Sequence, residues 1–517
     1  MNRPLALIFD IGTQSTRGLL FDKQGNLVHK SQVCEDFFVL GEDGRAEKDT
    51  LSLYDGVVEV CEQIRKDAPE LLDDVVAISV TSIRNTTVFL DAEGNPSRNT
   101  ILWLDKREVD CPDPLPAFNR FLYFLVGMSE GVRVSRKTSY TNWVRVNQPD
   151  IWAKTAKVVV PSTYVNFRLT GNLVESNAGI ACKIPFDYKK RCWQTKHGLT
   201  YPVFGTPIDK MCDLVNPGEI LGYVTEQCSK ETGLKQGLPV VASGTDKGCE
   251  SLGVGAVSSN VASISLGTAS SVEICTDKYV EPEAFMPAYP SVVMGKWNPE
   301  IQIFRGFWMV SWFREQFALY EQKEAEETGE KVERILDRKL SNVPVGSHGL
   351  ILQPLWGPGL KNPEAKGSMI GFTDVHDREY MYRAIIEGLC YGLLDGLNNM
   401  QTRAKIRVDR VGVSGGGSQS DVICQILCDV IGKPVYRVQT HETSGLGAAM
   451  ISFVGVKEFD DLEDALKSMR HVKDEFVPNS ADHKIYHEYY NRVYRRMYRY
   501  MRPLYDELYD ILGEKCK

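Results

Sequence analysis

The fold of this chain is decided by Leu7-Ile8-Phe9-Asp10-Ile11-Gly12-Thr13-Gln14-Ser15-Thr16-Arg17. An apolar segment ends in this aspartate, glycine and run of hydroxyls, and a second apolar segment, Gly18-Leu19-Leu20-Phe21-Asp22, follows at once. Two apolar segments joined by a short Gly/Thr/Ser turn predict a β-hairpin. Such a turn exposes N–H groups and hydroxyls that suit an anionic oxygen, and Asp10 could face a metal ion held by the same anion. An ordinary hairpin with a polar tip is the alternative.

The same pattern recurs in the middle of the chain, at Ala262-Ser263-Ile264-Ser265-Leu266-Gly267-Thr268-Ala269-Ser270-Ser271-Val272. Gly12-Thr13-x-Ser15 aligns with Gly267-Thr268-x-Ser270. Internal repeats reveal architecture. Two hairpins of a phosphate-binding type, one in each half, predict two related domains that face each other across a nucleotide.

Length and composition agree with two domains. At 517 residues the chain is too long for one core, and two domains of roughly 200–250 residues are expected. We place them at residues 1–253 and 254–517. Strands and helices alternate in the first half, which is typical of an α/β protein.

The composition also limits location and partners. A net charge of −8 argues against a nucleic-acid partner. Thirteen scattered cysteines without a CxxC pair predict reduced thiols in a cytoplasmic protein. We find no signal peptide and no apolar run of the roughly 20 residues that would span a membrane. A homodimer stays open.

Helical apolar spacing in the second half predicts helices over residues 317–340, 377–403, 421–431 and 481–502. Pro503 is expected to end or kink the last of these, with a short helical piece beyond it. Cys424 and Cys428 lie one helical turn apart. Two ligands do not make a zinc site, so we predict that both are buried core thiols.

A candidate base occurs in Ser243-Gly244-Thr245-Asp246-Lys247-Gly248, directly after a predicted strand. Sites of α/β proteins commonly lie at the ends of strands. Phosphoryl transfer to an alcohol needs a group that accepts the hydroxyl proton, and Asp246 suits that role. The alternative is a helix N-cap, which aspartate also forms well, and the two roles are compatible.

A candidate nucleotide loop occurs in Val413-Ser414-Gly415-Gly416-Gly417-Ser418-Gln419-Ser420. Three glycines after a strand let a backbone approach a flat ligand closely, and the N-terminus of the next helix suits a phosphate or adenosine. The chain contains no GxxxxGK[ST] sequence, so this is not a Walker loop. A flexible turn is the alternative.

A candidate acceptor site includes Arg84 and Asn85, which lie between two predicted strands. Their side chains offer hydrogen bonds to the hydroxyls of a polyol. Trp103 and Asp105 follow nearby and add an aromatic ring and an acid. The alternative is a polar surface loop with a salt bridge that faces solvent.

The hairpin, the aspartate after a strand, the second hairpin and the glycine triplet occur in the order of the FGGY carbohydrate kinases, which the chain resembles over nearly its whole length. Trp103-Leu104-Asp105-Lys106-Arg107 is similar to the family's W.D.R stretch, and Glu175-Ser176-Asn177-Ala178 to its (D)x(S/T)NA segment. The resemblance implies the fold of the superfamily that includes actin and hexokinase. That fold has two ribonuclease H-like domains, of the actin-like ATPase type, with a central cleft.

The resemblance also implies an activity, which is ATP-dependent phosphorylation of a small sugar, ketose or polyol. Mg²⁺ and ATP would bind between the domains, with Asp10 near the metal and Asp246 as general base and sugar ligand. The implied nucleotide contacts are Gly12, Thr13, Gln14, Ser15, Gly267, Thr268, Gly415, Gly416, Gly417, Ser418 and Gln419. The implied acceptor contacts are Arg84, Asn85, Trp103 and Asp246.

Several departures mark the chain as an atypical member and leave the acceptor open among xylulokinase-like, glycerol kinase-like and autoinducer kinase-like substrates. Glycerol kinases carry Arg-Glu where this chain has Arg84-Asn85, and xylulokinases carry Gln-Met-His near that position. Lys247 follows the candidate base, where relatives often have Gln or Asn. Residues 304–308, Phe-Arg-Gly-Phe-Trp, look closer to the autoinducer kinases.

Two other functions remain possible from the sequence. The first is a non-kinase ATPase of the actin-like superfamily that acts as a nucleotide-driven binding module and needs no base poised over an acceptor. The second is an acyl-phosphate kinase such as an acetate kinase. That enzyme would need arginines to grip a carboxylate, for which Arg84 and Arg305 are the candidates.

Overall fold

The computed structural model describes residues 3–34, 44–283, 286–357 and 364–512 of a mixed α/β chain. The chain forms two compact units. Unit 1 contains residues 1–253, 277–298 and 443–471, and unit 2 contains residues 254–276, 299–442 and 472–517. This grouping differs from a single cut after residue 253, because the chain returns to unit 1 twice. Each return is fixed by packing between segments far apart in the sequence, which no local pattern reports.

The central sheet of unit 1 has six strands in the order β13-β14-β5-β1-β2-β3. Their bounds are β1 (Leu5–Ile11), β2 (Ser15–Asp22), β3 (Leu27–Cys34), β5 (Val75–Ser82), β13 (Ile220–Tyr223) and β14 (Pro239–Val241). β1 and β2 pair antiparallel, from Leu5 opposite Asp22 to Ile11 opposite Thr16, so the predicted first hairpin is confirmed. β5 runs parallel to both β1 and β14. The carboxyl ends of these three strands therefore meet at one edge of the sheet.

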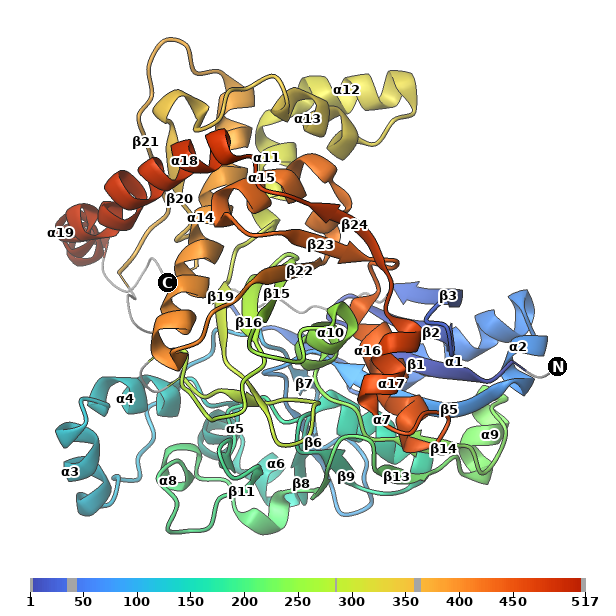
Figure 1. Ribbon diagram of the computed structural model, residues 1–517. Helices are drawn as coiled ribbons and strands as arrows, with labels where there is room; N and C mark the ends of the chain where they lie inside the picture. The colour runs from blue at the N-terminus through green and yellow to red at the C-terminus, as the bar shows by residue number, and fades with distance from the viewer. Residues whose placement is uncertain (1–2, 35–43, 284–285, 358–363, 513–517) are drawn as a thin grey trace. The chain divides into compact units, whose positions relative to one another are not determined.

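Helices cover both faces of this sheet (Figure 1). α1 (Ser52–Asp67) packs on β2 and β3, and α16 (Thr443–Gly455), from the late part of the chain, packs on β1 and β5. Glycines allow both approaches: a Cβ at Gly18 would lie 2.3 Å from Val60 of α1, and one at Gly445 would lie 2.4 Å from Leu19 of β2. α16 is apolar on most sides because it is a buried helix.

Unit 2 repeats this sheet in the order β19-β16-β15-β22-β23-β24. Its strands are β15 (Val261–Leu266), β16 (Ser270–Ile274), β19 (Glu300–Ile303), β22 (Arg410–Ser414), β23 (Val435–Val438) and β24 (Val472–Phe476). β15 and β16 form the predicted second hairpin. From β19 to β24 the pairs are antiparallel, antiparallel, parallel, parallel and antiparallel. The same order from β3 to β13 holds in unit 1, so the sequence repeat is a structural repeat.

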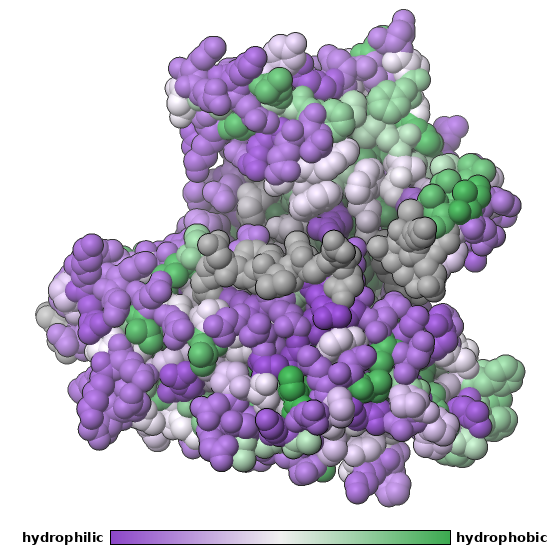
Figure 2. All heavy atoms as spheres, turned by 180° about the vertical axis from the view of Figure 1, so that it is seen from behind, coloured by the Kyte–Doolittle hydropathy of each residue, from purple (hydrophilic) through white to green (hydrophobic). Residues whose placement is uncertain are grey.

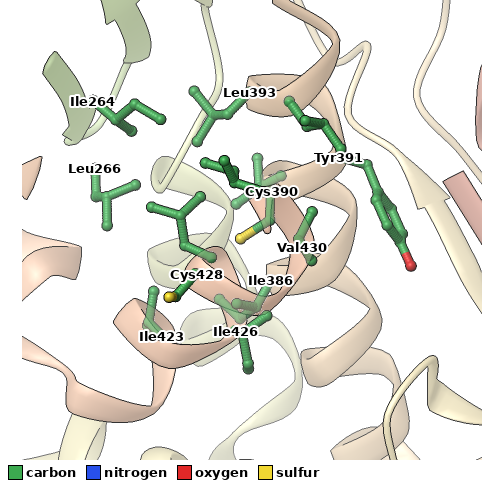
Figure 3. Close-up of a cluster of buried hydrophobic side chains, with 14 of the residues drawn as sticks. Ile264, Leu266, Ile386, Cys390, Tyr391, Leu393, Ile423, Ile426, Cys428 and Val430 are labelled. Carbon is green, nitrogen blue, oxygen red and sulfur yellow. The ribbon is translucent and has the colours of Figure 1, made fainter. Parts of the chain in front are cut away.

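Two predicted helices form much of the core of unit 2. α14 (Arg378–Ala404) begins after Asp377, whose side chain accepts hydrogen bonds from two backbone N–H groups of its first turn. α15 (Asp421–Ile431) has the predicted bounds. Figure 3 shows Cys390 and Cys428 among the aliphatic side chains of these helices and of β15. Cys424 and Cys428 are both fully buried, which confirms their prediction as core thiols.

Two helix predictions need correction. The region 317–340 is divided among α11 (Trp308–Phe317), α12 (Leu319–Thr328) and α13 (Val332–Leu340), because Gly329 adopts a φ of +71° and ends α12. The last helix begins as α18 (Ser480–Tyr489), passes through one π-helical segment at Tyr490–Tyr494, and continues as α19 (Arg495–Leu512). Pro503 does not end it. A proline removes one helical N–H. Tyr505, shortly after Pro503, is buried, and its ring centroid lies 6.5 Å from that of Tyr498 in the same helix.

The visible face in Figure 2 is mostly hydrophilic, with hydrophobic residues in small groups. Within the described residues, no helix combines the length and the apolar composition needed to cross a lipid bilayer.

Candidate functional site

In unit 1, three of the predicted site residues follow neighbouring strands at the same sheet edge. Asp10 lies near the end of β1, Arg84 follows β5, and Asp246 follows β14. Side-chain hydrogen bonds hold the last two strand ends together: Thr81 Oγ1 donates to the Gly244 carbonyl at 3.0 Å and Ser243 Oγ donates to the Val80 carbonyl at 2.7 Å. Ligands of open α/β sheets bind at such carboxyl ends.

Asp246 is the first residue of α10 (Asp246–Val254), but it does not cap this helix through its side chain in the usual way. Thr245 takes that role, because its Oγ1 accepts the Gly248 N–H at 3.2 Å, three residues on. The Asp246 carboxylate accepts a hydrogen bond from its neighbour, the Lys247 N–H, at 2.8 Å. The N-cap alternative for Asp246 is therefore wrong, and its carboxylate stays available beside a helix N-terminus.

Charges surround the Asp246 carboxylate. Arg84 Nε lies 3.8 Å from its Oδ1, and 26% of the Asp246 side chain is exposed. Burial raises the pKa of Asp246 above its ordinary value, while Arg84 and Lys247 act in the opposite direction. Burial also lowers the pKa of Lys247, but Glu250 and Asp246 outweigh it, and the net shift is upward. Lys247 Nζ donates to Glu250 at 2.8 Å.

Tyr289 is a site residue that the sequence did not reveal. It belongs to the segment 277–298, by which the chain returns to unit 1, and the Arg84 guanidinium lies 5.1 Å from its ring centroid. Val292 of the same segment lies against Gly244, where a Cβ would be 2.4 Å from its Cγ1. No local pattern marks Tyr289, because its partner Arg84 is about 200 residues earlier in the chain.

The other predicted acceptor residues have distinct surroundings. Asn85 is exposed and has a φ of +52°, a left-handed conformation that asparagine adopts more readily than most residues. Trp103 Nε1 donates to Thr13 Oγ1 at 3.0 Å, which links the acceptor residues to the first hairpin. The Asp105 side chain is buried, and its carboxylate is held by two hydrogen bonds from the Arg107 guanidinium, so we assign it a structural role.

The tip of the first hairpin is a tight turn. The Gly12 N–H donates to the Ser15 carbonyl at 2.9 Å, Gln14 is exposed, and Ser15 is buried. Asp10 accepts a hydrogen bond from Arg17 Nη1 at 3.1 Å. Across the described ranges, no three His, Cys, Asp or Glu side chains gather in a way that could hold a metal ion by themselves.

In unit 2, the glycine triplet packs directly on the second hairpin. Gly415 has a φ of +79°, and a Cβ there would lie 3.0 Å from the Gly267 nitrogen. The N–H groups of Phe307 and Trp308 donate to the carbonyls of Gly267 and Thr268, at 3.0 and 3.2 Å. The structure thus brings together the predicted nucleotide residues of this unit, and the residues that fix the hairpin carbonyls are ones the sequence did not identify.

Two hydrogen bonds hold the loop that contains the triplet. Ser418 Oγ donates to the Gly415 carbonyl at 2.7 Å, while Gly416 and Gln419 are exposed. Arg437 Nη1 donates to the Ser418 carbonyl at 2.9 Å. A Cβ at Gly416 would meet no atom within 4 Å, so the outer side of this loop is open to a ligand.

Two acidic groups lie near the start of α15. Arg437 pairs with Asp421, the first residue of α15, at 2.5 Å. Asp337 of α13 shares a hydrogen bond with Ser420, and burial raises the pKa of Asp337 to about 6. Ser420 also caps α15, because its Oγ accepts the Ile423 N–H at 3.1 Å. Asp337 and Arg437 were not predicted, because each reaches this loop only through tertiary packing.

Comparison with known proteins gives two family matches. A family model described as "FGGY family of carbohydrate kinases, N-terminal domain" matches residues 5–253, and the C-terminal domain of the same family matches residues 262–456. The chain is 29% identical to the uncharacterized sugar kinase YgcE of Escherichia coli (strain K12) over 488 residues, 94% of this chain and 92% of that protein. It is 25% identical to the xylulose kinase of Lactococcus lactis over 478 residues, 91% of this chain and 92% of that protein.

A solved structure is similar throughout. The crystal structure of xylulose kinase from Rhodospirillum rubrum matches with a TM-score of 0.80 at 22% identity, covering 97% of this chain and all of that one. This likeness shows the fold, so the predicted α/β class with two actin-like domains is confirmed.

Proposed function

We propose, because the chain belongs to the FGGY family of carbohydrate kinases, that it transfers the γ-phosphoryl group of ATP to a hydroxyl of a small sugar, ketose or polyol. Membership makes the enzyme a carbohydrate kinase. The observation that carries the proposed mechanism is the position of Asp246: Thr245 caps the helix, and the Asp246 carboxylate lies beside Arg84 at the carboxyl end of β14.

Asp246 acts as the general base in this proposal. Its carboxylate accepts the proton of the acceptor hydroxyl while that oxygen forms a bond to the γ-phosphorus and the bond from this phosphorus to the ADP oxygen breaks. Arg84, Asn85 and Trp103 orient the acceptor through hydrogen bonds and an aromatic face. The hydrogen bond from Trp103 to Thr13 supports this, because it couples an acceptor residue to a phosphate-binding hairpin.

The nucleotide residues fit ATP. The glycine loop has an open outer side at Gly416, which suits adenosine, and we assign Gly415, Gly417, Ser418 and Gln419 to the same pocket. We assign phosphate oxygens to the hairpin tips, at residues 12–15 of unit 1 and 267–268 of unit 2.

One carboxylate is enough for the metal in this proposal. Mg²⁺ in phosphate sites is usually held by one or two carboxylates together with phosphates and water, and Asp10 provides one. When bound, Mg²⁺ would neutralise charge on the phosphates. Arg17, which donates to Asp10, orients this carboxylate.

A coupled assay for ADP tests the proposal, with a panel of pentuloses, hexuloses, tetritols, glycerol and gluconate. We expect ADP formation to depend on at least one acceptor, and Asp246→Asn to lower its rate about 10²–10⁴-fold. Asp213→Asn, an exposed aspartate of the same unit, is the matched control and should stay near the wild-type rate.

Two results would contradict this function. ATP turnover that needs no acceptor and survives Asp246→Asn would favour the binding-module ATPase. Phosphorylation of acetate in place of every sugar would favour the acyl-phosphate kinase. An acyl-phosphate kinase would need arginines to bind a carboxylate, and the two candidates are Arg84 in unit 1 and Arg305 in unit 2. The Arg305 guanidinium lies 4.9 Å from the ring centroid of Trp308.

A further inference from the structure

Four charged side chains form one coupled group at the candidate acceptor site: Arg84, Asp246, Lys247 and Glu250. Arg84 Nε lies 3.8 Å from Asp246 Oδ1, and Lys247 Nζ lies 2.8 Å from Glu250 Oε2. Glu250 lies one helical turn after Lys247 on α10, so the local helix fixes that pair. The group carries two positive and two negative charges.

Water screens this group only in part. The Arg84, Lys247 and Glu250 side chains are 10%, 16% and 9% exposed, and the Asp246 side chain is 26% exposed. Asp246 and Lys247 each interact electrostatically with the other three members. Each cation therefore already has a carboxylate partner in a poorly solvated place, and the group is neutral as a whole.

We infer that the acceptor is an uncharged polyhydroxy compound, a polyol or ketose, and that this charge-balanced group discriminates against sugar acids. The inference rests on the proposed function and narrows its substrate class. Recognition of a carboxylate normally uses a cation that can turn its donors to the ligand. Here both cations face carboxylates of the protein.

A sugar acid would carry two costs at this site. Its carboxylate would add an unbalanced negative charge to a partly buried neutral group, which is unfavourable without a new partner. It would also disfavour the ionised form of Asp246, because a nearby like charge raises the pKa of a carboxyl group. Burial has already raised that pKa. An acid would thus bind more weakly and would also hinder the base.

Neutral hydroxyls do not have these costs. A hydroxyl donates to a carboxylate and accepts from a guanidinium or ammonium group, so a polyol can hydrogen-bond to the group without separating its ion pairs. The Tyr289 ring against Arg84 adds an apolar face for carbon-bound hydrogens. Lys247, in the position after the base, is thereby assigned as a specificity-determining residue together with Glu250.

The test compares acceptors that differ at one terminal carbon, a hydroxymethyl group in the neutral compound and a carboxylate in the acid: sorbitol with gluconate, ribitol with ribonate, and glycerol with glycerate, alongside the ketoses xylulose and ribulose. ADP formation by the full chain is measured as kcat/KM. We expect kcat/KM for a neutral acceptor to exceed that for every acid by at least about tenfold, which is well below the full effect of one charge–charge contact near a protein surface. An acid that exceeds all neutral acceptors would overturn the inference while leaving the kinase proposal intact.

Variants of the Lys247–Glu250 pair test the cause. Glu250→Gln removes the carboxylate that pairs with the Lys247 ammonium. The acid-to-neutral ratio of kcat/KM should then rise about tenfold. Lys247→Gln leaves Glu250 without that partner and should lower the same ratio. Glu226→Gln is the matched control, because Glu226 forms a glutamate–lysine pair at 2.6 Å on the exposed surface of α9 (Glu226–Thr232), and it should not move the ratio.

The acid-to-neutral ratio of kcat/KM separates an effect on specificity from an effect on folding. Loss of folded enzyme lowers the apparent kcat/KM for both acceptors by the same factor and leaves the ratio unchanged. A ratio that stays constant in both pair variants would overturn the inference. Absence of acceptor-dependent ADP formation with every compound would instead refute the proposed function, so the two failures are distinguishable.

Discussion

Replacing Arg84 with methionine should shift the pH dependence of the reaction, because Arg84 holds the candidate base in its ionised form. Burial raises the pKa of Asp246, and Arg84 is the largest influence that lowers it. Arg84→Met keeps most of the side-chain volume and removes the charge. The pKa of Asp246 should therefore rise further, so that the base is ionised only at higher pH.

The geometry sets the size of this shift. Two unit charges 3.8 Å apart interact by roughly 4 kcal/mol at an effective dielectric constant of about 20. One pKa unit corresponds to about 1.4 kcal/mol, so the upper limit is about three units. Water screens part of the interaction, because the Asp246 side chain is 26% exposed, and Lys247 keeps its own charge. We expect a shift of about one to two units.

The assay is kcat/KM for ADP formation against pH, with an acceptor from the screen, because this quantity reports the ionisation of the free enzyme. The acidic limb of the variant should lie about one to two pH units above that of the wild type. Arg133→Met is the control, since Arg133 pairs with Glu130 at the surface of the same unit, and its profile should not move. A loss of kcat/KM by the same factor at every pH would refute the reasoning and leave Arg84 only a binding role.

Two further predictions concern unit 2. Gly415→Ala should raise the KM for ATP with little change in the KM for the acceptor. Gly415 has a φ of +79°, and a Cβ there would lie 3.0 Å from the Gly267 nitrogen, so strain of about 1–3 kcal/mol is expected. An unchanged KM for ATP would contradict the assigned contact. Asp337→Asn should raise the Tm by about 2–4 °C at pH 8 and by much less at about pH 3.5, below the ordinary pKa of aspartate, measured by thermal unfolding. Burial raises the pKa of Asp337 to about 6, so the folded chain keeps a proton that the unfolded chain has released between about pH 4 and 6. Stability of the wild type therefore falls as the pH rises through that window, by about 1 kcal/mol after screening; an equal Tm gain at both pH values would contradict this cause.

Local sequence patterns were enough for the repeated parts of the fold. An apolar strand, Gly-Thr, a short turn and another strand specify a hairpin within about fifteen residues, so both hairpins appeared where predicted. Helical periodicity and a capping residue likewise fixed α14 and α15 nearly to the residue. Gly329 was visible in the sequence, but a single glycine costs a helix only about 1 kcal/mol relative to alanine, and its left-handed conformation follows from its surroundings.

The candidate site likewise has features that the sequence predicted and features that it did not. Asp10 lies near the end of β1, Asp246 follows β14 after a short loop, and the glycine triplet follows β22 directly. The carboxyl ends of parallel strands meet at one edge. Their proximity in each unit could therefore be expected from order alone. The sequence did not indicate that Thr245 caps α10 in place of Asp246, since both residue types cap helices well.

The sequence by itself determined the duplicated α/β sheet, its two Gly-Thr hairpins and the family, because each depends on residues that are neighbours in the chain. Only the tertiary structure decided which groups surround the candidate base. The segment 277–298 brings Tyr289 against Arg84, and strands far apart in the chain bring Arg84 to Asp246. The physical reason is that charge and burial depend on what lies within a few ångströms, whereas sequence spacing reports only contacts made by the same helix or turn.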